Sequence, residues 1–198
     1  MNIIQVGTNK AYDNLSTIIN KYSNNEINKL IMVEPFAYHN KSIEACYSNF
    51  SNKLYIENIV ITPNENHDPT ENIWYHHDDS VHSNAYELAS LNKQHASNIR
   101  SNYQINDMKS LELPCLTLNE LFNKYDTQTI DILYIDTEGF DDKLIYNINF
   151  DFFIIKKIFY ENLHIDANKL REFLISKNYL IKQSIQEDPY ADKAILCQ

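Results

Sequence analysis

Residues 130–139 read IDILYIDTEG, an apolar run that ends in acidic side chains and a glycine. Such a run is typical of a buried strand, and a glycine at its end permits a backbone turn that other residues resist. The chain has only two glycines in 198 residues, and the other, Gly7, ends the apolar run 3–6. Since ligands of open α/β sheets bind beyond the carboxyl ends of strands, the two glycines predict a ligand crevice. The alternative is a pair of ordinary strand-to-helix turns.

Strand-like runs alternate with helical patterns along the rest of the chain. The predicted strands are residues 2–6, 29–34, 53–61, 130–136, 154–161, 179–185 and 192–197. The predicted helices are residues 12–22, 40–50, 87–99, 117–124, 140–147 and 166–177. This alternation predicts an α/β fold with a doubly wound, mostly parallel sheet and helices on both faces. Only a short turn separates the last two strands, so we expect them to pair antiparallel.

The length of the chain predicts a single domain, residues 1–198. The interval 62–110 departs from the regular alternation and is expected to be an irregular insertion, in which residues 73–77 could form a short extra strand. The run His76-His77-Asp78-Asp79 contains metal-ligand residue types. Because neighbours in an extended segment point to opposite faces, we do not expect a metal there.

The composition disfavours several partners. The net charge of −10 makes nucleic acid and anionic membrane surfaces unlikely partners, because an acidic body repels phosphate. No apolar run approaches the ~20 residues that span a bilayer, and the N-terminus lacks the features of a signal peptide. Three cysteines without a CxxC pair argue against a disulfide framework and a zinc ribbon. A reducing, cytoplasmic location is therefore expected.

Two motifs near the N-terminus point to a nucleoside. Residues 6–13, VGTNKAYD, lead from a strand through a tight turn into a helix, where backbone N–H groups can meet a ligand that carries negative charge. The full G-x-G-x-x-G pattern is absent, which disfavours a nicotinamide dehydrogenase. Glu34 ends the second strand and could accept hydrogen bonds from both ribose hydroxyls. A solvated acid at a strand end is the alternative.

Polar groups also follow the later strands. Asp136 and Glu138 share one face if extended, and could act as a general base or as metal ligands. Alternatively, Asp136 or Asp141 caps the next helix. The run 159–164, FYENLH, ends in His164, which is either a proton acceptor or structural. Ser90 either caps a helix or lines the crevice.

With these motifs, the sequence resembles the FkbM-type methyltransferases, a family of S-adenosylmethionine-dependent O-methyltransferases. The matching segments are residues 4–9, 33–35, 58–61, 88–91, 116–121, 130–139 and 160–164. The resemblance implies a Rossmann-like class I methyltransferase fold. Its sheet would have seven mostly parallel strands, with the last strand antiparallel.

The resemblance also implies a site. The residues that match the cofactor-binding positions of the family are Gly7, Thr8, Asn9, Glu34, Pro35, Asn58 and Val60. The positions that would face the acceptor hydroxyl are Asp136, Glu138 and His164. Many members have Asp where this chain has Gln5, and Asp13 could replace part of that polarity. The expected acceptor is a hydroxyl of a small molecule or sugar, with specificity set by residues 62–110.

The main hypothesis is O-methylation, with Asp136 or His164 as the base and Glu138 as an orienting group. A metal-assisted version would place Mg²⁺ on Asp136, Glu161 and Asn162. A second class of function is a non-catalytic binding module that keeps the fold. Many family members have a second glycine where this chain has Lys10 or Ala11, and this altered first motif favours the binding module.

Overall fold

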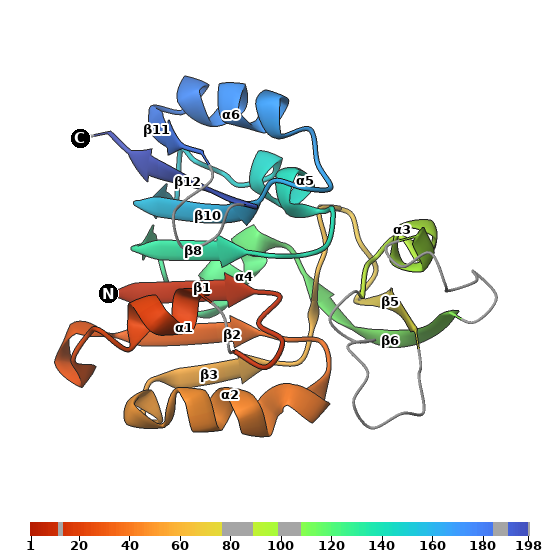
Figure 1. Cartoon of the computed structure of the whole chain (residues 1–198), viewed down its shortest axis with the longest axis horizontal. Helices are drawn as coiled ribbons and strands as arrows, with labels where there is room; N and C mark the ends of the chain where they lie inside the picture. The colour runs from red at the N-terminus through yellow and green to blue at the C-terminus, as the bar shows by residue number, and fades with distance from the viewer. Residues whose placement is uncertain (12–13, 77–88, 99–107, 184–189, 198) are drawn as a thin grey trace.

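The computed structural model describes residues 1–11, 14–76, 89–98, 108–183 and 190–197. Seven strands form a large central sheet (Figure 1). They are β1 (Asn2–Val6), β2 (Lys29–Val33), β3 (Leu54–Glu57), β8 (Ile132–Ile135), β10 (Lys157–Glu161), β11 (Tyr179–Lys182) and β12 (Ala191–Leu196). Their order is β11-β12-β10-β8-β1-β2-β3.

The sheet is mostly parallel. Strands β3, β2, β1, β8 and β10 pair parallel with one another. Only β12 is antiparallel to its two neighbours, β10 and β11. The predicted α/β fold with a large, mostly parallel sheet is therefore confirmed, and the last two strands form the expected antiparallel pair.

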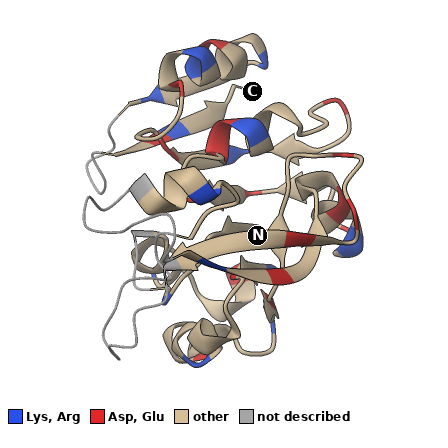
Figure 2. Cartoon of the chain, turned by 90° about the vertical axis from the view of Figure 1, so that its right-hand side faces the viewer, with Lys and Arg blue, Asp and Glu red and all other residues tan. Residues whose placement is uncertain are grey.

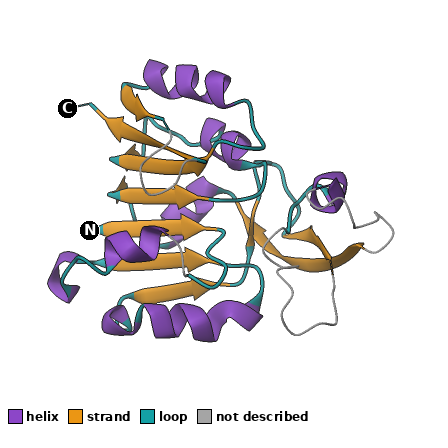
Figure 3. Cartoon of the chain, in the orientation of Figure 1, coloured by secondary structure: helices purple, strands orange, loops and turns teal. Residues whose placement is uncertain are grey.

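Helices cover both faces of the sheet (Figure 3). They are α1 (Asn14–Ile19), α2 (Asn40–Cys46), α4 (Leu118–Lys124), α5 (Asp141–Tyr146) and α6 (Ala167–Ser176). Short 3-10 helices are η1 (Asn24–Glu26), η2 (Ala37–His39) and η3 (Ser48–Phe50). Along β2, Leu30 and Met32 belong to the core cluster that includes residues of α1 and α2, whereas Ile31 and Val33 belong to the cluster that includes residues of α4, α5 and α6. This alternation follows from the two-residue period of a strand.

The predicted helix at 117–124 begins where the sequence places its capping box. The Thr117 backbone N–H donates to Glu120 Oε2 at 2.7 Å, and the Glu120 N–H donates to Thr117 Oγ1 at 3.2 Å. The reciprocal pair satisfies two backbone donors at the start of α4. Leu121 and Phe122 then bury the inner face of this helix against the sheet.

A smaller three-stranded sheet lies beyond the carboxyl ends of the central strands (Figure 1). Its members are β4 (Val60–Ile61), β6 (Met108–Leu116) and β5 (Thr70–His76), and α3 (Lys93–Asn98) lies against it. The remaining strands, β7 (Thr129–Ile130) and β9 (Ile154–Ile155), form a short parallel pair. The interval 62–110 thus contains β5, α3 and the beginning of β6.

Several predicted elements differ from the structure. The strands predicted at 130–136 and 154–161 are each divided, because Ile130 and residues 154–155 belong to the β7–β9 pair and not to the central sheet. The single strand predicted at 53–61 is wrong: β3 ends at Glu57, and Val60 and Ile61 pair with β6 of the small sheet instead. The chain leaves the central sheet at Asn58, whose side chain bonds to the ends of neighbouring segments. The helix predicted at 87–99 is shorter among the described residues, because Asn92 caps α3 from its N-terminal side.

On the face where the small sheet lies, Figure 2 shows basic and acidic segments interspersed over the described residues rather than gathered in one basic patch. Among the helices in the described ranges, none combines the length and apolar character that a membrane crossing needs.

Candidate functional site

A cavity of about 280 Å³ opens beyond the carboxyl ends of β1, β2 and β8. This volume is close to the lower end of the ~300–1,000 Å³ typical of small-molecule sites. The turn after β1, the segment after β2 and the turn after β8 line its inner side, while β4, β5 and residues 89–91 line its outer side. Glu34 and Asp136 therefore lie at the same end of the central sheet and border one cavity.

Gly7 turns the chain at the floor of this cavity. Its φ is +81°, and its N–H donates to the carbonyl of Val33 at 3.1 Å. A Cβ at this position would lie only 1.8 Å from the backbone oxygen of Asp136. The glycine is therefore required by the close approach of the neighbouring strand β8, as well as by its positive φ.

Glu34 is a buried acid held between two backbone donors. Its Oε2 accepts from the N–H of Asn9 at 2.7 Å, and its Oε1 accepts from the N–H of Phe36 at 2.9 Å. Its side chain lines the cavity, and the residue is 4% exposed. Burial raises the pKa of Glu34 to about 7, against the lowering effect of these two hydrogen bonds. Each carboxylate oxygen retains a lone pair for a ligand.

Asn9 offers a second acceptor to the cavity. It has a φ of +50°, a conformation that Asn tolerates better than most residues. Its Oδ1 is buried and has no hydrogen-bond partner among the described residues. Because a buried acceptor without a partner is unfavourable, a ligand with a donor group fits this position in the cavity wall.

The other predicted cofactor residues are distributed around this pair. Pro35 and Val60 line the cavity. Thr8 is buried beneath it, with Oγ1 3.7 Å from the sulfur of Met32. Asn58 donates to the carbonyl of Glu34 at 2.8 Å and so holds that segment from outside the cavity wall. Asp13 lies outside the described residues.

The turn after β8 brings two carboxyl groups to the cavity. Asp136 has an exposed side chain and Glu138 a half-buried one, and both residues line the cavity. Glu138 has a φ of +50°. Burial, followed by the negative charges of Glu161 and Asp141, raises the pKa of Glu138 to about 8. The two acids therefore differ in their environments, although they are only two residues apart.

Asp141 fixes the shape of this turn. Its side chain is fully buried. Asp141 Oδ2 accepts hydrogen bonds from the N–H and the hydroxyl of Thr137, at 3.1 and 2.8 Å. Asp141 Oδ1 accepts a hydrogen bond from the N–H of Glu161 at 3.1 Å. The carboxylate thus joins the end of β8 to the end of β10. Its burial raises the pKa of Asp141 despite these hydrogen bonds. Asp141 is the first residue of α5, and the cap position itself is Phe140.

The polar cluster at the end of β10 is largely structural. Asn162 donates to Oδ1 of the buried Asp192 at 2.9 Å, while Tyr160 and Arg171 donate to its Oδ2 at 3.3 and 2.6 Å. Asn162 is thereby turned toward β12. The set Asp136, Glu161 and Asn162, suggested by the sequence for Mg²⁺, stays a prediction that the geometry does not favour.

Ser90 belongs to the cavity lining, whereas His95 and His164 lie beside Glu138 and are not among the described residues that line the cavity. Ser90 lines the cavity, and its hydroxyl donates to the carbonyl of Glu138 at 3.2 Å. His164 is exposed, and its ring lies edge-to-face with that of His95, with 4.9 Å between the ring centroids. Burial, then the neighbouring His164 and Lys143, lower the pKa of His95. His95 is not among the site residues predicted from the sequence, because one histidine in a short helical pattern carries no distinctive spacing. In the run His76-His77-Asp78-Asp79, residues 77–79 lie outside the described residues.

Comparison with curated proteins and with solved structures gave no match. The profile of one protein family, described as the methyltransferase FkbM domain, matches residues 5–181. The match includes the turn after β1, Glu34, the turn after β8 and the end of β10, which together form the site described above. The chain therefore belongs to the FkbM methyltransferase family.

Proposed function

We propose that the protein is an S-adenosylmethionine-dependent O-methyltransferase that acts on a hydroxyl of a small molecule or glycan. The observation that carries this proposal is the pairing of Glu34 with Asn9. A buried carboxylate and a buried amide oxygen, which has no partner among the described residues, border one cavity, in a chain of a methyltransferase family. Such acceptors suit the hydroxyl and amino groups of an amino-acid nucleoside.

The chain offers a group for each part of this cofactor. The Glu34 carboxylate would accept hydrogen bonds from the ribose hydroxyls. The apolar side chains of Ile59, Val60 and Ile61 line the cavity on the side of β4 and would flank the adenine. S-adenosylmethionine, when bound, supplies an electrophilic methyl group. The turn at Gly7 lies between these groups and the acids that follow β8.

The remaining task of the chain is to orient the acceptor and to take its proton. Asp136 is the first candidate for the base because its exposed carboxylate borders the cavity. His164 is the alternative base. Glu138, at the same rim, would orient the acceptor hydroxyl. Among the described residues of the interval 62–110, Ile73 and residues 89–91 line the outer wall, and we assign acceptor selection to this interval.

One observation favours a non-catalytic binding module instead. Ala11 has a φ of +60°, a conformation that strains a residue with a Cβ. The resemblance implies that many family members have a second glycine where this chain has Lys10 or Ala11. A module that binds the nucleoside but does not turn over would retain the cavity, so binding alone cannot separate the two functions.

Methyl transfer itself is the test. The full chain is incubated with isotopically methyl-labelled S-adenosylmethionine and a panel of sugars and small alcohols, and the products are analysed by mass spectrometry. The enzyme hypothesis predicts labelled product with the wild type and a large loss with Asp136→Asn. The matched control, Asp142→Asn, changes an acid outside the cavity and should retain activity. Binding of cofactor without transfer to any acceptor would support the binding module.

A further inference from the structure

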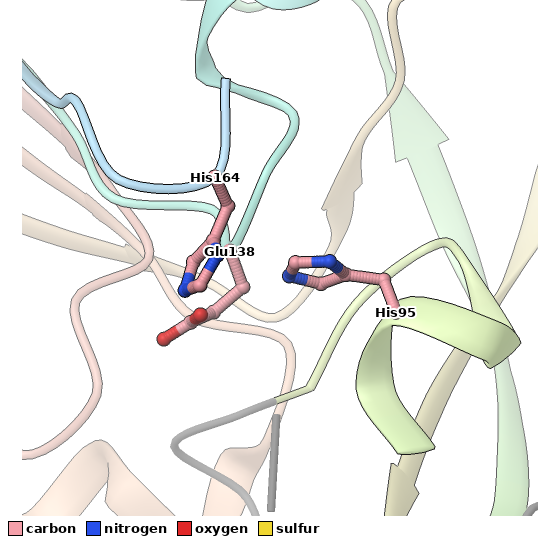
Figure 4. Close-up of side chains that lie close together, drawn as sticks. All are labelled: His95, Glu138 and His164. Atoms are coloured by element: carbon pink, nitrogen blue, oxygen red, sulfur yellow. The ribbon is translucent and has the colours of Figure 1, made fainter. Parts of the chain in front are cut away.

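Three metal-ligand side chains from separate segments converge beside the cavity (Figure 4). His95 comes from α3, Glu138 from the turn after β8, and His164 from the loop after β10. One ligand atom from each lies within 4.8 Å of the others. We propose that His95, Glu138 and His164 bind a divalent transition-metal ion.

The chemistry of these groups selects the class of ion. Two imidazoles and one carboxylate form a set that suits zinc and other first-row transition metals. Mg²⁺ and Ca²⁺ prefer oxygen ligands. Three protein ligands leave at least one position open, as in catalytic rather than structural zinc sites. The site therefore differs in both residues and ion from the Mg²⁺ set suggested by the sequence.

The unoccupied hydrogen-bonding capacity of the three groups supports the proposal. His95 Nε2 is buried without a hydrogen-bond partner in the described part of the chain. Across the same residues, no donor bonds to the Glu138 carboxylate, whose neighbours Glu161 and Asp141 are also negative. The His164 ring lies edge-to-face with that of His95 and is exposed, so the buried atom left unsatisfied is His95 Nε2. A cation would satisfy both imidazoles and offset the repulsion among the acids.

The geometry requires only a small adjustment. Ligand atoms about 2.1 Å from a tetrahedral metal lie about 3.4 Å apart, so the observed 4.8 Å limit calls for modest side-chain rotation. His164 is exposed and Glu138 half-buried, which leaves room for such rotation. Gly139 provides space for the His95 ring and for the start of the His164 side chain, because a Cβ there would lie 3.1 Å from His95 Cε1 and 3.3 Å from His164 Cβ.

The position of the site suggests its role. Glu138 lines the cavity as well as belonging to the metal set, so the open position of the ion would be near the acceptor. This role rests on the proposed methyl transfer: the ion would bind the acceptor hydroxyl and lower its pKa. Glu138 and His164 would then be ligands, and Asp136 would remain as the group that receives the proton. Ion binding itself does not depend on this role.

Metal binding is measured on the full chain without cofactor. The protein is freed of metal with a chelator, dialysed, and titrated with Co²⁺ by absorption spectroscopy and with Zn²⁺ by calorimetry. The wild type should bind one ion at this site. His95→Ala, Glu138→Gln and His164→Ala should each weaken binding at least about tenfold, because even groups that only orient metal ligands contribute that much. Circular dichroism establishes that each variant is folded.

A control addresses a second group of potential metal ligands among the described residues, which contains His67, Cys115 and Glu120. His67 lies 3.2 Å from the Cys115 sulfur and 2.9 Å from Glu120 Oε2. The variant His67→Asn should retain the wild-type affinity. If it loses binding while His95→Ala keeps it, the ion occupies that group and the proposal is wrong.

X-ray absorption of the zinc-loaded wild type provides a measurement that needs no variant. It should show two imidazole ligands with oxygen completing the shell. Oxygen ligands alone, or a sulfur ligand, would overturn the proposal, as would the absence of binding at millimolar ion. A protein that binds no metal but still binds the cofactor would contradict the metal proposal alone. A metal-loaded protein that transfers no methyl group would contradict the proposed function instead.

Discussion

The backbone N–H of Asn9 donates to Glu34 Oε2 at 2.7 Å, so the turn after β1 holds the carboxylate that ends β2. This bond brings the two acceptors of the cavity together. Asn9 supplies the backbone donor that orients Glu34, while its own Oδ1 has no partner among the described residues. The same residue therefore organises the site and contributes to it.

Asn9→Gly separates these two contributions. Glycine tolerates the observed φ of +50° and keeps the backbone donor to Glu34, but removes Oδ1. We expect stability within about 1 kcal/mol of the wild type. Affinity for S-adenosylhomocysteine should fall about fivefold to tenfold, the value of one hydrogen bond. Calorimetry and urea unfolding measure the two quantities. Unchanged affinity would show that Oδ1 does not contact the ligand.

Gly7→Ala tests the close approach of β8. The new Cβ would lie 1.8 Å from the Asp136 carbonyl oxygen, a backbone atom that cannot move without displacing the strand. We expect a loss of about 3 kcal/mol or more in unfolding free energy. The comparison is Gly139→Ala, where the nearest atoms are side-chain atoms 3.1–3.3 Å away, and a smaller loss is expected. Equal losses in urea unfolding would mean that positive φ, not the contact, dominates.

The pKa of Glu34 predicts a pH dependence of stability. The pKa rises from 4.5 to about 7 on folding. At pH values between 4.5 and 7, the folded protein therefore holds a proton on Glu34 that the unfolded chain has released. Raising the pH across this window therefore favours unfolding. Relative to Glu34→Gln, the wild type should lose up to about 3 kcal/mol of stability from pH 4.5 to pH 7 and little above it. A constant difference in urea unfolding across these pH values would refute the shift.

Asp141→Asn tests the joint between β8 and β10. The carboxylate accepts three hydrogen bonds, from Thr137 and Glu161, and an amide can satisfy fewer of them. We expect a loss of about 2 kcal/mol and a displaced turn at Glu138, with weaker metal binding. Asp142→Asn, one residue along, should change stability by less than about 0.5 kcal/mol. If the two variants unfold alike in urea, the buried network does not hold the turn.

Much of the fold could be predicted from the sequence because its signals are local. The apolar runs of β1, β2, β8 and β10 and the capping box of α4 each specify their own element. The small sheet could not be predicted in the same way. Strand β6 has four consecutive exposed residues, 109–112, and contains Pro114, so it lacks the alternating pattern of a half-buried strand, and its strand character depends on pairing with β5, which is distant in sequence.

The site was predictable to a similar extent. Glu34 and the turn after β8 follow strands, so the topology alone places them at one edge. Their environments depend on the folded chain: the burial of Glu34 and the two bonds to its oxygens involve Asn9 and Phe36. His95 was not predicted because α3 brings it beside Glu138 through the small sheet, a contact that no local pattern encodes.

The most direct measurement of the central claim is calorimetric titration of the full chain with S-adenosylhomocysteine. The wild type should bind one equivalent, Glu34→Ala should lose most of the affinity while remaining folded by circular dichroism, and Glu44→Ala, an exposed acid on α2, should bind as the wild type does. No heat of binding at millimolar ligand, or equal affinity in Glu34→Ala, would contradict a nucleoside site at the ends of β1, β2 and β8.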